Sequence, residues 1–163
     1  MKIRPVKETD AQGILDIYTP YIENTAITFE CNIPHLAEFK HRVNQIATRF
    51  PYFVAEDNGN IVGYTYASTY YDRTAYDWTA ELSIYVRQDI RGKGVGEQLY
   101  TALENALKEQ GFVNLLACIS LPNDASIHFH LKNGFKKVGF FEKIGYKFNQ
   151  WHDIIWMQKR LIS

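Results

Sequence analysis

The feature that most constrains the fold is a glycine-rich turn between a strand pattern and a helix pattern. Residues 82–86 alternate apolar and polar side chains, which predicts a strand, and a helical pattern begins at Glu97. Such a turn exposes backbone N–H groups at the positive end of the helix dipole, and glycine lets a ligand approach the main chain closely. The turn is therefore a candidate phosphate site, although glycines also simply end strands. It consists of Arg91, Gly92, Lys93, Gly94, Val95 and Gly96.

The segment after the turn predicts a strand–helix–strand crossover. Leucines and alanines recur at helical spacing up to Gly111, which is placed to end the helix as a C-cap glycine. Residues 113–119 are then almost wholly apolar, which indicates a strand buried on both sides. Because two strands joined by a crossover helix run parallel, we expect residues 82–86 and 113–119 to be parallel neighbours.

The first half of the chain predicts a strand, two helices and a hairpin. A first strand is expected over residues 2–6, and Thr9 to Gln12 matches a capping box for a helix that ends near Tyr21. A second helix follows Pro34 and carries Leu36, Phe39, Val43 and Ile46 on one face. Residues 52–56 and 61–67 read as an antiparallel hairpin, because Asp-Asn-Gly-Asn between them is a turn sequence.

The end of the chain predicts a short helix and a closing pair of strands. The helix covers residues 126–132, and the strands cover residues 135–142 and 151–158 with a connection between them. Neither a repeat nor a low-complexity linker interrupts the sequence, so we expect a single domain over residues 1–163.

Composition narrows the possible partners. Among 163 residues, 18 Lys and Arg balance 18 Asp and Glu, so no overall field favours nucleic acid or an anionic membrane. Cys31 and Cys118 are too few for a disulfide framework and show no metal-ligand spacing, and the histidines are scattered. We therefore expect a cytoplasmic protein without a metal, a membrane partner or a nucleic-acid partner.

Several motifs occur in an order that resembles the GNAT superfamily of N-acetyltransferases, and the phosphinothricin N-acetyltransferase subfamily in particular. Residues 91–96 match the superfamily's Arg/Gln-x-x-Gly-x-Gly/Ala motif for acetyl-coenzyme A. The subfamily resemblance is carried by residues 75–81 and 121–124, by His130 with residues 133–135, and by residues 145–147 followed by 151–153.

The resemblance implies a GNAT fold of the α/β type. This fold has a central mixed, mostly antiparallel sheet with a splayed parallel strand pair and flanking helices. Acetyl-CoA is then the co-substrate: residues 91–96 would hold its pyrophosphate, and the backbone of Ile84 and Val86 would pair with its pantetheine arm. Asn123 would bind the pantetheine amides, or alternatively cap the short helix after it.

Acetyl transfer to an amine requires a group that removes a proton from the ammonium form. Glu81 matches the family's proposed general base and faces away from the aliphatic stripe of its strand; an exposed strand glutamate is the alternative. His130 matches a family position implicated in catalysis, and a structural histidine is its alternative. The backbone N–H of Val86 would polarise the thioester carbonyl. Tyr85 is a further candidate, since many relatives across the superfamily use a tyrosine as the acid; a packing aromatic is its alternative.

The acceptor is implied less specifically. By the resemblance Arg73 and Tyr76 bind substrate, and a guanidinium with a phenol suits an amino-acid carboxylate. The alternatives are a solvated loop charge for Arg73 and a packing aromatic for Tyr76. Tyr71 stands where the herbicide-modifying enzymes carry a basic residue, which puts phosphinothricin in doubt. We therefore expect a small amino acid or amino-acid analogue as acceptor. The alternatives are a peptide, a protein N-terminus or a polyamine, or a non-catalytic acyl-CoA sensor.

Aromatic residues near the C-terminus are candidates for a homodimer face, which the family also uses, or for core packing. They are Phe140, Phe141, Trp151 and Trp156. His152 and Asp153 are adjacent on a predicted strand and so point to opposite faces, which favours a structural role for both.

Overall fold

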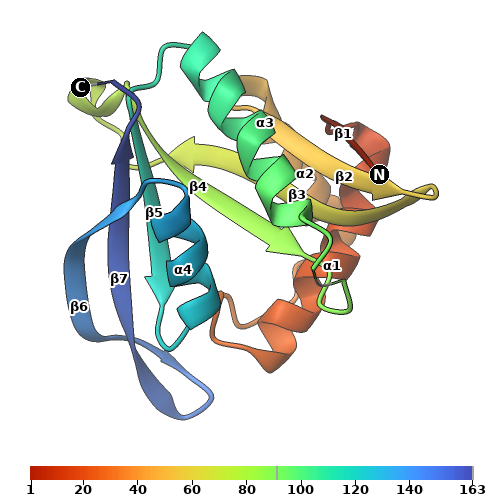
Figure 1. The fold of residues 1–163 in the computed structure, drawn as a ribbon. Helices are drawn as coiled ribbons and strands as arrows, with labels where there is room; N and C mark the ends of the chain where they lie inside the picture. The colour runs from red at the N-terminus through yellow and green to blue at the C-terminus, as the bar shows by residue number, and fades with distance from the viewer. Residues whose placement is uncertain (91, 163) are drawn as a thin grey trace.

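The computed structural model describes residues 1–90 and 92–162, and within them seven strands form one mixed sheet (Figure 1). The strand order is β1-β2-β3-β4-β5-β7-β6. The β4–β5 pair is parallel and every other pair is antiparallel, which confirms the expected fold class. The strands are β1 Lys2–Pro5, β2 Tyr52–Asp57, β3 Asn60–Thr69, β4 Thr79–Val86, β5 Asn114–Ser120, β6 Lys136–Lys147 and β7 Gln150–Arg160.

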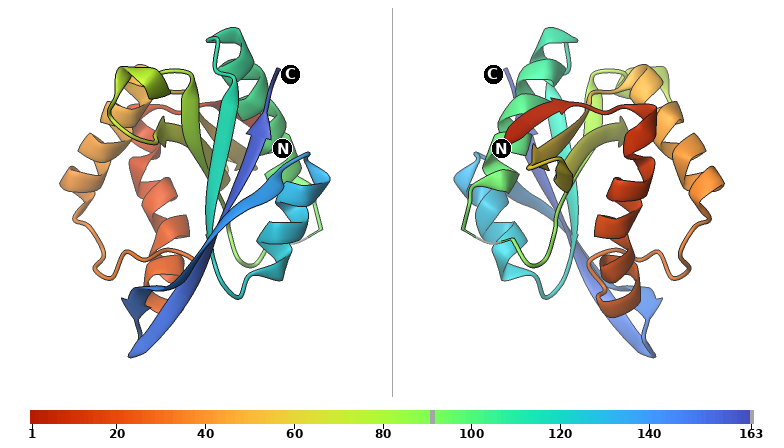
Figure 2. Two further views of the ribbon diagram at one scale, coloured as in Figure 1. Left: turned by 90° about the vertical axis from the view of Figure 1, so that its left-hand side faces the viewer. Right: turned by 90° about the vertical axis from the view of Figure 1, so that its right-hand side faces the viewer.

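Helices cover both faces of the sheet (Figure 2). Helices α1 (Ala11–Asn24) and α2 (Leu36–Arg49) lie on one face, and α3 (Val95–Glu109) and α4 (Asp124–Lys132) lie on the other. The core beneath α3 is mainly aliphatic and contains Leu103 and Leu107, whereas the core beneath α1 and α2 is rich in tyrosine. Single turns of 3-10 helix, η1 Glu8–Asp10 and η2 Thr74–Tyr76, precede α1 and β4.

The parallel pair is short, and the two strands then separate. Only Thr79, Ala80 and Glu81 of β4 pair with β5, opposite Asn114, Leu115 and Leu116. Beyond Glu81 the strands diverge, as Figure 1 shows, because β4 stays paired with β3 and β5 stays paired with β7. The sheet therefore forks immediately after Glu81.

The start and the end of α1 differ from the prediction. Thr9 does not cap it: Asp10 is the N-cap and makes no capping hydrogen bond to the helix, because its carboxylate binds the backbone N–H of Lys7 and the side chain of Arg4. The helix also continues past Tyr21 to Asn24 although Pro20 lies inside it. Burial of Ile22, which is 1% exposed, holds this last turn against the core.

Two strand predictions also need correction. Strand β5 is not buried on both sides: Leu115, Ala117 and Ile119 are buried, but Cys118 on the opposite face is exposed because the fork opens beside it. Strand β6 does not end at Glu142. It passes through a bulge, where Lys143 has a φ of 48°, and continues to Lys147. The β6–β7 connection is consequently a tight turn at residues 148–149, both with positive φ.

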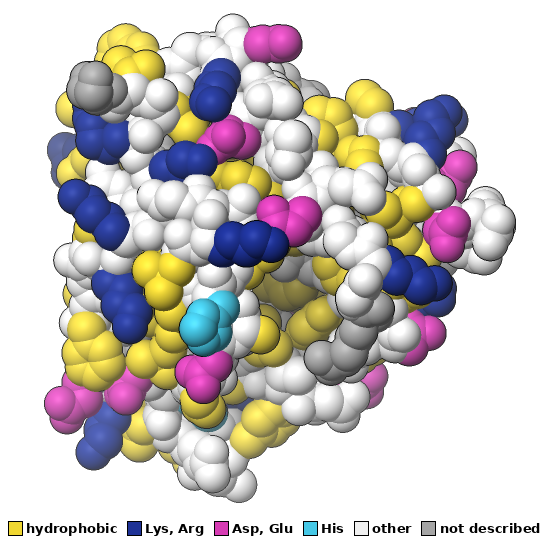
Figure 3. Space-filling model, viewed as in Figure 1, with side chains coloured by type: hydrophobic (Ala, Val, Ile, Leu, Met, Phe, Trp, Pro, Cys, Tyr) yellow, Lys and Arg dark blue, Asp and Glu magenta, His cyan; other side chains and the backbone are white. Residues whose placement is uncertain are grey.

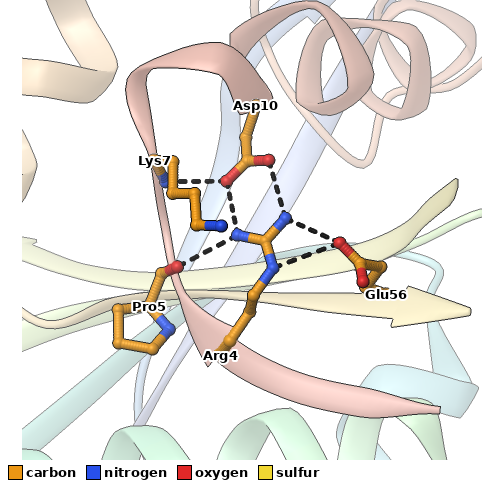
Figure 4. Close-up of polar contacts among 5 residues, drawn as sticks. All are labelled: Arg4, Pro5, Lys7, Asp10 and Glu56. Carbon is orange, nitrogen blue, oxygen red and sulfur yellow. Dashed lines mark hydrogen bonds and ion pairs between the residues drawn. The ribbon is translucent and has the colours of Figure 1, made fainter. Parts of the chain in front are cut away.

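A polar network fixes the first strand to the start of α1 (Figure 4). The Arg4 guanidinium donates to both oxygens of Asp10, at 2.8 and 2.9 Å, and to Glu56 Oε1 at 2.9 and 3.2 Å. Burial would raise the pKa of Asp10, but the hydrogen bonds from Arg4 and the Lys7 backbone outweigh it, so that the pKa is lowered. Asp10 is therefore a buried carboxylate that depends on Arg4.

Replacing Arg4 by methionine should destabilise the fold by about 3 kcal/mol, because it leaves the buried Asp10 charge without its partner. Urea unfolding at pH 7 measures this, with Lys2→Met, an exposed position on the same strand, as the control. The contribution of Asp10 to the free energy of unfolding is fully present above the ordinary Asp pKa of about 3.9. It is lost as the pH falls through the lowered pKa of Asp10 in the folded protein. Equal stability of the two variants at pH 7 would contradict this role.

Candidate active site

A cleft of about 480 Å³ opens where β4 and β5 separate. Figure 3 shows it as a hollow with apolar side chains inside. One wall is formed by residues 82–86 of β4 and the other by residues 117–120 of β5, with α4 and the N-terminus of α3 at its rim. Because β4 and β5 do not pair here, the facing strand edges offer backbone N–H and C=O groups to a ligand that extends along the cleft.

The glycine turn lies at one end of this cleft. Gly92 and Gly94 have φ values of 70° and 69°, a conformation that favours glycine, and Gly94 is the N-cap of α3. The first N–H groups of the helix have no partner within it, and Gly96 lines the cleft. Val95 is buried, Lys93 is exposed, and Arg91 lies outside the described residues. This is the geometry of an anion site at a helix N-terminus.

Asn123 both lines the cleft and caps α4. Its Oδ1 accepts a hydrogen bond from the Ser126 N–H at 3.2 Å, which confirms that Asn123 caps the short helix. The structure shows no hydrogen bond from its amide nitrogen to another described residue, which leaves two N–H donors for a ligand in the cleft.

His130 brings an unpartnered nitrogen to the same cleft. The residue is 6% exposed on α4, and its Nδ1 lies 2.7 Å from the Ser126 carbonyl oxygen, to which a protonated Nδ1 donates. Nε2 is then an acceptor; it is buried and has no partner among the described residues. Burial lowers the pKa of His130, against the opposing effect of the bond to Ser126. The imidazole is therefore neutral near pH 7.

Glu81 lies at the apex of the fork. It is the last β4 residue paired with β5, and the cleft wall begins at the next residue, Leu82. Its side chain is half-buried, without a hydrogen bond or ion pair to any described residue, and burial raises its pKa. The side chain points to the tyrosine-rich side of the sheet, where Tyr85 of the same strand face packs against Tyr18 and Tyr21.

The structure does not bring Arg73 and Tyr76 into the cleft. Both are exposed in the segment between β3 and β4, beside and within η2. The Tyr76 ring packs edge-on against Tyr70 and Tyr71, with centroids 5.4 and 6.1 Å apart. Tyr71, where the resemblance breaks, is 61% exposed.

Other cleft residues carried no local sequence signal. The Tyr21 hydroxyl donates to the Val86 carbonyl oxygen, although helical spacing gave Tyr21 only a place in the core face of α1. Cys118 lines the cleft opposite β4, and enclosure by the cleft with the charge of Glu81 raises the pKa of its thiol to about 11. The thiol is therefore protonated near neutral pH. Ile27 and Ser120 complete this part of the wall.

Within the described residues, no group of three or more His, Cys, Asp or Glu side chains is arranged to hold a metal ion. Likewise, none of the helices in this part of the chain has the length and apolar character needed to cross a membrane.

Comparison with known proteins identifies the class to which this forked sheet with its glycine-capped helix belongs. Residues 3–156 match the family described as "Acetyltransferase (GNAT) domain". Phosphinothricin N-acetyltransferase of Streptomyces viridochromogenes is 35% identical over 159 residues, covering 98% of this chain and 87% of the relative. The L-methionine sulfoximine/L-methionine sulfone acetyltransferase of Pseudomonas aeruginosa is 35% identical over 164 residues, covering 98% and 94%.

Solved structures give the same result. A phosphinothricin acetyltransferase from Sinorhizobium meliloti in complex with acetyl-CoA has a TM-score of 0.94 and 34% identity, covering 98% of this chain and 88% of its own. A Salmonella typhimurium structure with acetyl-CoA has a TM-score of 0.96 and 27% identity, covering 100% and 95%. The chain belongs to the GNAT acetyltransferase family and is an acetyl-CoA-dependent N-acetyltransferase.

Proposed function

We propose that this enzyme transfers the acetyl group directly to the primary amine of a small amino acid or amino-acid analogue of the phosphinothricin or methionine sulfoximine kind. The observation that carries the proposal is the half-buried Glu81 carboxylate at the apex of the fork, which has no hydrogen bond or ion pair to another described residue. The names of relatives that acetylate such compounds and cover nearly the whole chain support the choice of acceptor.

The donor site that we propose combines the glycine turn with the open edge of β4. Backbone N–H groups of residues 92–96, together with the charges of Arg91 and Lys93, would hold the pyrophosphate. The backbone of Ile84 and Val86 and the amide of Asn123 would bind the pantetheine arm, since all three residues line the cleft. Bound acetyl-CoA supplies an acetyl group activated as a thioester.

In this proposal Glu81 is the general base. An amine acceptor is mostly protonated near pH 7, and Glu81 takes that proton directly or through a water, which frees the nitrogen lone pair for attack on the thioester carbon. The Val86 N–H stabilises the charge that develops on the carbonyl oxygen. As the C–S bond breaks, a proton must reach the departing sulfur. Because the His130 ring starts neutral, His130 could donate this proton only after its Nε2 has first accepted a proton.

Direct transfer is favoured over a covalent acyl-enzyme. Cys118 is the only cysteine among the described cleft-lining residues, and partial desolvation in the cleft with the charge of Glu81 raises its pKa to about 11, so that little thiolate is present near pH 7. An acetyl-cysteine intermediate would need that thiolate as nucleophile.

The acceptor carboxylate is assigned to Arg73 and Tyr76 as part of this proposal. Both side chains are solvent-exposed in the segment that leads into β4, the strand that carries Glu81. Because Tyr71 supplies no positive charge, we expect weaker binding of acceptors with a second acidic group. Peptides, polyamines and a purely binding role for acyl-CoA are the competing possibilities.

A screen for release of free thiol from acetyl-CoA tests the acceptor class. Methionine sulfoximine and methionine sulfone should give acceptor-dependent thiol release and an N-acetyl product, and phosphinothricin should need a higher concentration because it carries a second acidic group. Peptides and spermidine are included in the same screen. Activity with peptides or polyamines but not with amino acids would overturn the acceptor class, and tight coenzyme binding without any thiol release would indicate a sensor.

Replacing Glu81 by glutamine should lower kcat by about 10²–10⁴-fold, because the amide cannot accept the proton. In the parent enzyme, kcat should rise with pH as Glu81 loses its proton, at a pH above the ordinary glutamate pKa of 4.5, because burial raises the pKa of Glu81. This rise should be absent in E81Q. Pre-steady-state or kcat profiles between pH 5 and 9 measure both. Glu109→Gln, an exposed position at the end of α3, is the control. Full turnover by E81Q across the profile would remove Glu81 from this role.

We further propose a homodimer built on the β6–β7 hairpin. Strand β6 is an edge of the sheet, and Phe140, Phe141 and Trp151 are 57%, 49% and 60% exposed, whereas Trp156 is only partly exposed. Neighbouring apolar side chains extend the surface: Val138, Ile144, Tyr146 and Phe148. A free strand edge and an apolar patch of this kind favour self-association.

Light scattering after size exclusion should give the mass of two chains of 19.0 kDa each. Phe140→Glu or Trp151→Glu should produce monomers, because each places a charge in the apolar surface. Trp78→Glu, at an equally exposed tryptophan outside the hairpin, should remain dimeric. A monomeric parent protein at micromolar concentration would contradict the proposal.

A further inference from the structure

Residues 25–35 join α1 to α2 without forming a helix or strand. We call this segment the strap. The strap runs from the end of α1 past the fork and back to α2 (Figure 2). Side chains from several elements fasten it. The Ser120 hydroxyl of β5 donates to the Ala26 carbonyl, the Tyr18 hydroxyl bonds to Thr28 Oγ1 at 2.8 Å, and Arg42 of α2 holds Glu30.

The strap forms a wall of the site on the side to which Glu81 points. Ile27 lines the cleft, and the bond from Ser120 joins the strap to the β5 arm of the fork. Tyr18, which contacts Thr28, also packs edge-on against Tyr85 at a ring distance of 5.2 Å, and Tyr85 shares the β4 face with Glu81. Movement of the strap would therefore change the shape of the space beside the base, while the glycine turn lies elsewhere on the cleft.

Lys147 holds the strap from the end of β6, more than a hundred residues away in sequence. Its side chain is buried, with 4% exposure, and Nζ donates to the Thr28 and Glu30 carbonyl oxygens, both at 2.8 Å. The nearby Glu30 carboxylate compensates part of the cost of burying this ammonium group. Burial lowers the pKa of Lys147, and the nearby Cys31 and Glu30 side chains act in the opposite direction.

The strap also rests directly on the backbone of β6. A Cβ on Gly145 would lie 2.3 to 2.7 Å from the ring of Phe29, a separation that real side chains do not adopt. The Phe29 ring lies 6.0 Å from that of His152 on β7. The hairpin and the strap therefore fit together at two points, Phe29 on Gly145 and Lys147 on the two carbonyls.

We propose that Lys147 is a positioning residue that anchors the strap and thereby sets the affinity of the site for the acceptor amine. This inference rests on the proposed function for its kinetic consequence. Lys147 acts through the strap, because two of its N–H groups are committed to strap carbonyls. Loss of Lys147 leaves the Arg42–Glu30 ion pair and the Tyr18–Thr28 bond in place, so its effect is local to the strap.

The test compares Lys147→Met with Lys137→Met, an exposed lysine on the same strand. In K147M the KM for the acceptor should rise about tenfold or more, which corresponds to the loss of one or two charge-assisted hydrogen bonds. The KM for acetyl-CoA should stay within about twofold of the parent value. Hydrogen–deuterium exchange without substrate should be faster in residues 25–35 of K147M and unchanged in α3, and K137M should match the parent protein in every measurement.

A folded K147M with parent-like strap exchange and acceptor KM would overturn the inference, and so would a fall in kcat with both KM values unchanged. Should K147M fail to fold, Lys147→Gln, which keeps a shorter N–H donor, is judged by the same criteria. If the parent enzyme acetylates no acceptor, the proposed function fails, while strap exchange still decides whether Lys147 is the anchor.

Discussion

The structure depends on a parallel strand pairing that stops after three residue pairs. Strands β4 and β5 pair only as far as Glu81 and Leu116, while each pairs antiparallel with its other neighbour over seven residue pairs. The long antiparallel ladders hold the two arms apart, so the fork is a fixed part of the sheet. Unpaired strand edges would be costly in a closed core; here they face a cleft, where a ligand can satisfy them.

Strand alternation divides the chemistry between the two faces of this fork. Leu82 and Ile84 pack toward α3 with the aliphatic core, and Glu81 and Tyr85 point toward α1 and α2. The half-buried position of Glu81, which has no partner among the described residues, raises its pKa, and this brings the carboxylate closer to the range useful for a base near neutral pH. On β5, partial desolvation inside the cleft and the charge of Glu81 keep the Cys118 thiol protonated although the residue is exposed.

The parts of the fold that the sequence predicted well are those determined by neighbours along the chain. The strand, glycine turn, helix and returning strand are contiguous, and Gly96, Asn123 and His130 indeed line one cleft. The errors arose where distant residues intervene. Asp10 binds Arg4, which is itself held by Glu56 of β2, instead of capping α1, and the open fork exposes Cys118. The contact between Tyr21 and Val86 spans 65 positions, and no local periodicity could have indicated it.

The same distinction separates the donor side of the site from the acceptor side. The candidate donor site is built mostly from residues 84–96, whose backbone must keep one geometry to present its N–H groups. The acceptor side that we propose combines the strap, the end of β6 and the segment before β4, and contacts such as Lys147 to Thr28 join the first two of these. Substitutions in these scattered parts can alter the space beside Glu81 and leave the glycine turn unchanged. We therefore expect proteins that share the coenzyme motif to differ in acceptor through residues outside the motif.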